Sequence, residues 1–185
     1  MSYQVSAIPN LVARVEDGCA VVVTPFDHAR VHRGDVWEYS VTTAAKNDGQ
    51  THVLHIVPDA GIDELHFIFA AGGSGAGFAR LYEGPTVTLG GEPEAPLNGT
   101  EVTPRNRMRI TARQQAFASK LYHTPTTSDN GTLLIEAAFG SGKNTDGLHR
   151  EDEWVLDPSK TYLLILESDS ASNVMSADLV LYEKA

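Results

Sequence analysis

The C-terminal part of the chain constrains its fold most, because apolar runs follow one another there across a clear turn. The run Tyr162 to Leu166 is apolar throughout and begins soon after Asp157-Pro158-Ser159-Lys160. Proline cannot donate a ladder hydrogen bond, and Asp, Pro and Ser favour turns, so this tetrapeptide predicts a corner before a strand. Alternation then places Tyr162, Leu164 and Leu166 on one face. The stretches from Trp154 to Glu167 and from Asp178 to Glu183 are therefore interpreted as consecutive strands.

Alternation of apolar and polar residues recurs along most of the chain and predicts an all-β protein. Turn residues separate the runs at intervals typical of an antiparallel sandwich. Lys46-Asn47-Asp48-Gly49 and Asp129-Asn130-Gly131 contain residues that tolerate positive φ, and the glycine-rich stretch 72–77 predicts a loop. The predicted strands are Ala20–Thr24, Val36–Thr43, Thr51–Val57, Glu64–Ala71, Phe78–Tyr82, Phe117–Tyr122, Thr132–Phe139, Thr161–Glu167 and Ala177–Tyr182. Together they suffice for two packed sheets.

Three segments give less definite patterns. Between 107 and 121 a strand and a helix compete, because Met108, Ile110 and Ala112 alternate while Ile110, Phe117 and Leu121 fall at helical spacing. Residues 83–104 are rich in Pro and Gly, which predicts a long surface connection with at most one short strand. The first residues are either a flexible arm or, at Leu11 to Val15, an edge strand.

The size of the chain fits one main domain. Its 185 residues are 42% hydrophobic, which is enough to bury a core. We expect a β-sandwich domain over residues 36–185, preceded by an N-terminal arm or edge segment over residues 1–35. The single cysteine, Cys19, excludes an intramolecular disulfide and is interpreted as a small buried hydrophobe. No run approaches the roughly 18 apolar residues that cross a bilayer, so we expect no membrane partner.

The charge balance restricts the partners. The formal net charge is −10, from 24 acidic and 14 basic residues. This excess opposes binding to a nucleic-acid backbone, where Lys and Arg must replace condensed counterions. One basic stretch stands out, with Arg105, Arg107 and Arg109 followed by Arg113. We take Arg105, Arg107 and Arg109 as a candidate interface for an acidic partner, the alternative being a solvated or internally paired stretch.

No residue pattern predicts catalysis, a cofactor or a metal. His52 and His55 are three positions apart on a predicted strand and so project from opposite faces, which is wrong for chelating one ion. Arg33-Gly34-Asp35 matches an adhesion tripeptide but is more typical of a turn entering a strand. Gly140-Ser141-Gly142-Lys143-Asn144 lacks the spacing of a phosphate loop and predicts a hairpin loop. We therefore expect a protein that is not an enzyme and holds no cofactor or metal.

Four groups of short segments occur together in one order and carry a resemblance. They are Leu81-Tyr82-Glu83-Gly84-Pro85-Thr86; Asn106-Arg107; Tyr122-His123-Thr124-Pro125-Thr126 with Gly131-Thr132-Leu133; and Glu153-Trp154-Val155-Leu156 through Tyr162-Leu163-Leu164 to Leu181-Tyr182-Glu183. In this order they resemble a family of tailed-bacteriophage virion proteins that are similar to head decoration, cement or head-fibre proteins. The resemblance covers roughly residues 36 to 183 and assigns no catalytic residue.

The resemblance implies a fold and a function. The fold is an antiparallel β-sandwich of jelly-roll type that assembles as a homotrimer. The partner is the major capsid protein, and the location is the outer capsid surface of the virion, after synthesis in the host cytoplasm. The implied function is to stabilise the capsid. The alternative is a receptor- or glycan-binding module of a tail fibre or head surface, which predicts exposed rings from Trp37, Tyr82 or Trp154 in a groove.

Overall fold

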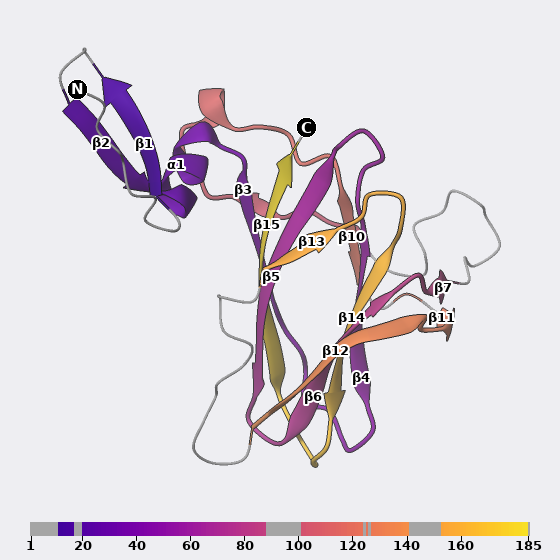
Figure 1. The fold of residues 1–185 in the computed structure, drawn as a ribbon. Coiled ribbons are helices and arrows are strands. Elements are labelled where there is room, and N and C mark those ends of the chain that lie inside the picture. Colours follow the sequence, from indigo (N-terminus) through magenta and orange to yellow (C-terminus); the bar gives the residue numbers. More distant parts are fainter. Residues whose placement is uncertain are drawn as a thin grey trace. The chain divides into compact units, whose positions relative to one another are not determined.

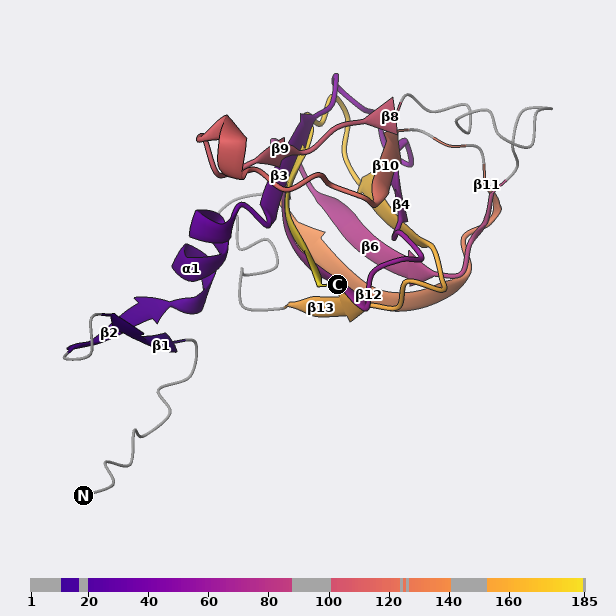
Figure 2. The same ribbon diagram turned by 90° about the horizontal axis from the view of Figure 1, so that it is seen from above.

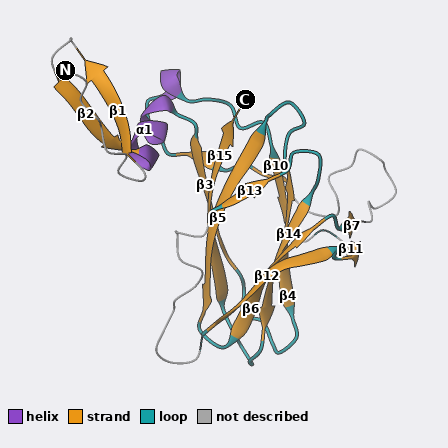
Figure 3. Ribbon diagram, in the orientation of Figure 1, coloured by secondary structure: helices purple, strands orange, loops and turns teal. Residues whose placement is uncertain are grey.

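A computed structural model describes residues 11–16, 20–87, 101–123, 125, 127–140 and 153–184. The described chain is almost entirely β-structure (Figure 3) and divides into two compact units. The smaller unit comprises Met1–Val36 and Asn106–Ala116, and the larger comprises Trp37–Arg105 and Phe117–Ala185. Several sequence predictions lie outside the described residues: the N-terminal arm at 1–10, the burial of Cys19, the middle of the Pro- and Gly-rich connection at 88–100, and the loop after Gly140.

The smaller unit contains a hairpin followed by a short helix. Strand β1 (Leu11–Glu16) pairs antiparallel with β2 (Ala20–Pro25), which resolves the N-terminal alternative in favour of a strand. Helix α1 (Phe26–Arg33) follows directly. The sequence prediction missed this helix, because its polar composition hides the period of its few apolar residues. Pro25 before it and Gly34 after it are the end signals that mark it.

The end of α1 explains the Arg33-Gly34-Asp35 tripeptide. The N–H of Gly34 donates to the carbonyls of Arg30 and Val31, at 3.1 Å each, and its φ is 77°. A positive φ at this position is the usual way for a helix to stop. Arg33 Nε also lies 3.2 Å from Asp35 Oδ2. The tripeptide is therefore a helix end and a turn that leads into β3 (Val36–Thr42), as the turn interpretation predicted.

The larger unit consists of two antiparallel sheets packed face to face, which confirms the predicted all-β sandwich (Figures 1 and 2). The five-stranded sheet has the order β13 (Trp154–Leu156), β5 (Glu64–Gly73), β15 (Met175–Lys184), β3, β9 (Arg105–Asn106). The six-stranded sheet has the order β12 (Thr132–Phe139), β6 (Gly77–Glu83), β14 (Tyr162–Ser168), β4 (Thr51–Val57), β10 (Lys120–His123), β8 (Glu101–Val102). A separate ladder joins β7 (Thr86–Val87) and β11 (Thr127–Asp129).

The core lies between the two sheets and follows the predicted alternation. Every second residue of β5 from Leu65 to Ala71 is buried in it. In β14 the core residues are Tyr162, Leu164 and Leu166, the three that the sequence placed on one face. The intervening Leu163 and Ile165 are also buried, with exposed fractions of 0% and 6%. Strand β14 is thus covered on both faces, which accounts for its unbroken apolar run.

One prediction about the middle of the chain is wrong in detail. The predicted strand Phe117–Tyr122 begins only at Lys120, in β10. The N–H groups of Ala118 and Ser119 donate instead to the carboxylate of Glu183, at 3.0 and 2.6 Å, so these two groups do not donate to a neighbouring strand. For residues 107–121 the sequence left a strand and a helix as alternatives. The helical structure in this segment is the 3₁₀ turn η1 (Thr111–Arg113).

The connection over residues 83–104 was predicted to hold at most one short strand. Its described parts contain two, β7 and β8. Each is two residues long and pairs with a strand distant in sequence: β7 with β11, and β8 with β10. Such short strands form because a distant strand is available to pair with them, so a local sequence pattern does not predict them.

Candidate functional site

The outward face of the five-stranded sheet carries a hollow of about 290 Å³. It lies over three neighbouring strands, β5, β15 and β3. The side chains around it that face outward are Ile68 and Ala70 of β5, Asp178 and Val180 of β15, and Glu38 and Ser40 of β3.

Strand register and small side chains together produce this hollow. Asp178 stands opposite Ala70, and Val180 stands opposite Ile68. Ala70 and Ser40 project little from the sheet, so their larger neighbours surround a depression. Its lining is partly apolar, and the acidic residues Glu38 and Asp178 are among the lining residues. The hollow therefore offers apolar contact and negative charge side by side.

The sequence analysis did not identify this hollow. Each strand contributes two residues at positions i and i+2, which share one face of a strand. That spacing is visible in the sequence at 38 and 40, at 68 and 70, and at 178 and 180. Only the sheet order shows that the three pairs are neighbours, and the sequence did not supply that order.

Another part of the same face is occupied by a polar cluster around His66. Its Nδ1 contacts the carboxylate of Glu153, and its Nε2 lies 3.1 Å from Glu64 Oε2. The imidazole stacks on Tyr182, with 4.3 Å between ring centroids. Lys184 Nζ donates to Glu64 at 3.0 Å, and the hydrogen bonds from Lys184 and His66 lower the pKa of Glu64. These groups satisfy one another and join β5 to its two neighbours, β13 and β15.

The predicted interface residues are distributed over both units. Arg105 belongs to the larger unit, as part of β9, whereas Arg107 and Arg109 belong to the smaller one. Arg105 and Arg109 are exposed, and Arg107 is half-buried. The backbone N–H of Arg107 donates to the carbonyl of Val36 at 2.9 Å. The interface role of these three arginines stays a prediction.

Histidines of β4 lie on opposite faces of the six-stranded sheet, as predicted. The ring of His52 lies 5.0 Å from that of His123, and the ring of His55 lies 6.1 Å from that of Tyr122. Because Tyr122 and His123 are adjacent in β10, these two contacts are on opposite sides. The hydroxyl of Tyr39 also hydrogen-bonds to Nε2 of His123. Across the described segments, no group of three or more His, Cys, Asp or Glu residues is placed to hold a metal ion.

Both histidines of β4 are buried, with exposed fractions of 8% for His52 and 4% for His55. Burial lowers the pKa of His55 to about 4. Burial also lowers the pKa of His52 to about 4, with smaller contributions from the positive charges of His123 and Lys46. Neither ring nitrogen of His55 has a hydrogen-bond partner among the described residues. The neutral imidazole is thus the form that the folded protein holds.

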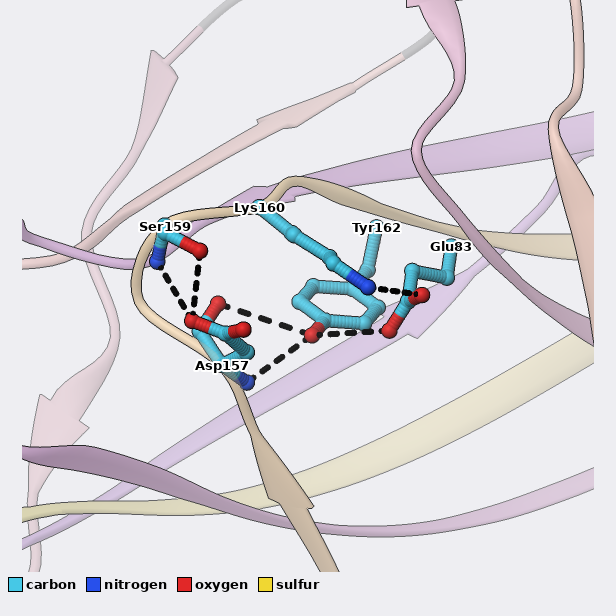
Figure 4. A network of polar contacts seen from close by, with 5 residues as sticks. All are labelled: Glu83, Asp157, Ser159, Lys160 and Tyr162. Atoms are coloured by element: carbon cyan, nitrogen blue, oxygen red, sulfur yellow. Dashed lines mark hydrogen bonds and ion pairs between the residues drawn. The ribbon is translucent and has the colours of Figure 1, made fainter.

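The corner predicted at Asp157-Pro158-Ser159-Lys160 forms a network of polar contacts with Tyr162 and with Glu83 of β6 (Figure 4). Asp157 Oδ1 accepts from the backbone N–H and the hydroxyl of Ser159, at 2.8 and 2.7 Å, and these bonds lower the pKa of Asp157. The hydroxyl of Tyr162 accepts from the N–H of Asp157 at 2.8 Å and donates to Glu83 Oε2 at 3.3 Å. Lys160 Nζ donates to Glu83 Oε1 at 2.5 Å. Burial is the main cause that raises the pKa of Tyr162 to about 12.

The aromatic rings that the glycan-binding alternative placed in a groove do not line the hollow. Trp37 is 3% exposed and packs against Phe117, with 5.2 Å between ring centroids. Trp154 is partly buried against the core. Tyr82 is also partly buried. The hollow is therefore a site with carboxylates and aliphatic side chains, which differs from a sugar-stacking platform.

Two comparisons with known proteins found no match for this chain. No protein-family model matches it, and a search of curated proteins returns no match. A search of the helices in the described ranges finds none with the length and apolar character that a membrane crossing requires.

Proposed function

We propose that this chain is a non-enzymatic virion structural protein that binds the outside of a phage capsid and stabilises it, as a homotrimer. The support from sequence is the ordered set of segments that resembles phage decoration proteins. The observation that carries the proposal is that two of these segments, which are distant in sequence, contact each other through side-chain hydrogen bonds in the sandwich. Glu83 at the end of β6 contacts Lys160 and Tyr162 at the start of β14. These two segments thus contact each other within the sandwich.

The strand order supports the jelly-roll part of the proposal. Four adjacent strands of one sheet are β3, β15, β5 and β13, and four of the other are β4, β14, β6 and β12. We number these eight strands by their order along the chain, from β3 as the first to β15 as the eighth. Across one sheet the order is then first, eighth, third and sixth, and across the other sheet it is second, seventh, fourth and fifth. Two Greek keys folded over each other give this kind of interleaving between two sheets.

Such a sandwich suits a mechanical role. A shell filled with DNA is pushed outward, and a rigid module that spans neighbouring subunits opposes their separation. A trimer engages three equivalent patches at once, so that weak individual contacts add through effective concentration. A module that binds only the mature shell stabilises that state by mass action. The net charge of −10 also fits an outer surface better than contact with packaged DNA.

Electron microscopy of purified particles with and without this protein tests the proposal. We expect additional density on the outside of the shell at threefold or quasi-threefold positions when the protein is present. We also expect light scattering of the isolated protein to give a mass three times that of one chain. Absence of the protein from purified particles, together with failure to bind mature shells, would overturn the proposal.

A further inference from the structure

We propose that Tyr39, His52 and His123 of the larger unit form a binding site for one Zn²⁺ ion, which ties the two sheets of the sandwich together. This inference goes beyond the proposed function and does not depend on it. The sequence analysis considered His52 only together with His55, which lies on the other face of β4. The fold gives His52 a different histidine, His123, as its neighbour.

Three strands from the two sheets bring these side chains together. Tyr39 belongs to β3 of the five-stranded sheet, whereas His52 and His123 belong to β4 and β10 of the six-stranded sheet. In the ladder between β4 and β10, His123 stands opposite Leu54, a core residue two positions from His52. His52 and His123 therefore lie on the same, inward face of their sheet. Tyr39 packs against the core from the opposite sheet.

The possible donor groups of the site lie close to one another. The rings of His52 and His123 meet edge to face, with 5.0 Å between their centroids and an interplanar angle of 88°. The hydroxyl of Tyr39 hydrogen-bonds to Nε2 of His123. His52 is 8% exposed, and its buried Nε2 has no hydrogen-bond partner among the described residues. Because a buried polar atom without a partner costs stability, this nitrogen is a candidate ligand for an ion beside the other two donors.

The chemistry of these groups selects the ion. Imidazole binds Zn²⁺ in its neutral form, and burial lowers the pKa of both His52 and His123, so that both rings are neutral at pH 7. The third donor is the phenol oxygen of Tyr39, which distinguishes this set from groups of His, Cys, Asp and Glu. Burial raises the pKa of Tyr39, and a bound cation opposes that effect because it stabilises the phenolate. Mg²⁺ and Ca²⁺, in contrast, prefer sites built from oxygen ligands.

His55 provides a contrast within the same strand. It is also buried, and both of its ring nitrogens lack a hydrogen-bond partner among the described residues. The aromatic ring beside it in the described chain is that of Tyr122, with 6.1 Å between ring centroids. Burial alone would therefore make both histidines of β4 equal candidates. A second imidazole and a phenol oxygen are placed together only on the face of His52, as far as the described residues show.

Isothermal titration calorimetry with Zn²⁺ alone tests the site. The sample is the full chain, prepared without a histidine tag and freed of metal with a chelator. We expect one Zn²⁺ per chain at pH 7 and a higher melting temperature with Zn²⁺, which EDTA reverses. The affinity should fall as the pH is lowered, because protons compete for the imidazoles. Mg²⁺ should leave the melting temperature unchanged.

Substitutions locate the ion. His52→Phe, His123→Gln and Tyr39→Phe each remove one donor. We expect each to weaken binding by at least roughly tenfold, because even groups that only hydrogen-bond to a ligand change metal affinity by that much. His55→Phe removes a buried imidazole from the other face of the strand and should bind Zn²⁺ like the wild type. Lys46→Gln removes a positive charge that acts on His52 and should tighten binding.

Circular dichroism checks that every variant is folded, and Tyr39→Phe, which removes a single oxygen, keeps the test informative if a histidine variant does not fold. Absence of Zn²⁺ binding by the wild type at pH 7 would overturn the inference. Binding that His52→Phe and Tyr39→Phe leave unchanged would also overturn it, because the ion would then lie elsewhere in the chain. Equal loss of binding in His55→Phe would show an effect of core packing and would refute the assignment. Binding to capsid shells is measured separately, so none of these results decides the proposed function.

Discussion

The two buried histidines of β4 predict that the larger unit loses stability in mild acid. The perturbation is a pH change from 7 to 4.5, compared between the wild type and His55→Phe. His55 is 4% exposed, and burial lowers its pKa in the folded state to about 4. In the unfolded chain, a histidine titrates near pH 6.5. Between these two values the unfolded state binds a proton that the folded state does not.

This difference sets the sign and the size of the effect. Proton binding by the unfolded state favours unfolding, so stability is complete above about pH 6.5 and is lost as the pH falls toward 4. The loss is about 1.4 kcal/mol per pH unit for each histidine and reaches about 3 kcal/mol when the pH passes the folded value. His52 has a folded pKa of about 4 as well, and its contribution adds to that of His55. The sum is comparable to the total stability of a domain, about 5 to 15 kcal/mol.

Urea unfolding at both pH values, followed by tryptophan fluorescence, measures the effect. We expect His55→Phe to reduce the acid-induced loss of unfolding free energy by about 2 kcal/mol. At pH 7 the variant should be about as stable as the wild type, because phenylalanine has a similar shape and no buried nitrogen to satisfy. His32→Gln, at an exposed position of α1, is the control and should keep the wild-type loss. Equal losses for the wild type and His55→Phe would refute the reasoning.

Two further predictions concern the corner network and the turn between β11 and β12. Tyr162→Phe removes one hydrogen bond from the N–H of Asp157 and one to Glu83, so we expect a loss of about 1 to 3 kcal/mol in urea unfolding; a change below about 0.5 kcal/mol would contradict the network's stabilising role. Gly131→Ala should destabilise more than Gly49→Ala. Both glycines have positive φ, 85° and 71°, but a Cβ on Gly131 would meet the carbonyl oxygen of Glu83 at 2.3 Å, whereas the space at Gly49 is open. Thermal unfolding of the two variants measures this difference, and equal melting temperatures would show that the turn at Gly131 can shift to relieve the contact.

The fold was predictable where a local pattern is sufficient. Strand β5 alternates buried and partly exposed residues along most of its length, and the turn after Asp157 uses residues with known turn chemistry. Strand β14 shows the limit of such reasoning. Its apolar run predicted a strand and the correct core face, yet the burial of Leu163 and Ile165 on the other face depends on what surrounds them. Periodicity identifies a strand, but burial on its second face depends on tertiary packing.

Elements that depend on a distant partner were not predictable in the same way. Val102 of β8 pairs with Leu121 of β10, and the described ladder contains only two residues of β8. The residue at which β10 starts also depends on a distant part of the chain, because the carboxylate of Glu183 near the C-terminus accepts hydrogen bonds from the N–H groups of Ala118 and Ser119. The helix α1 is a different case. Its two end signals, Pro25 and Gly34, are present in the sequence and carry more information than its weak periodicity.

The hollow is also formed by residues that are distant in sequence, so the sequence alone could not identify it as a candidate site. Glu38 and Asp178 are far apart in sequence, and neither belongs to a recognisable motif. They become neighbours because the chain places its last strand, β15, between β3 and β5. Arg105, Arg107 and Arg109 represent the opposite situation, a compact cluster in sequence that is divided between two units in the structure. The interface role of the three arginines stays a prediction, and proximity in sequence did not reveal which outward residues line the hollow. In a sandwich whose neighbouring strands come from distant parts of the sequence, outward residues that meet across strands are the more informative candidates.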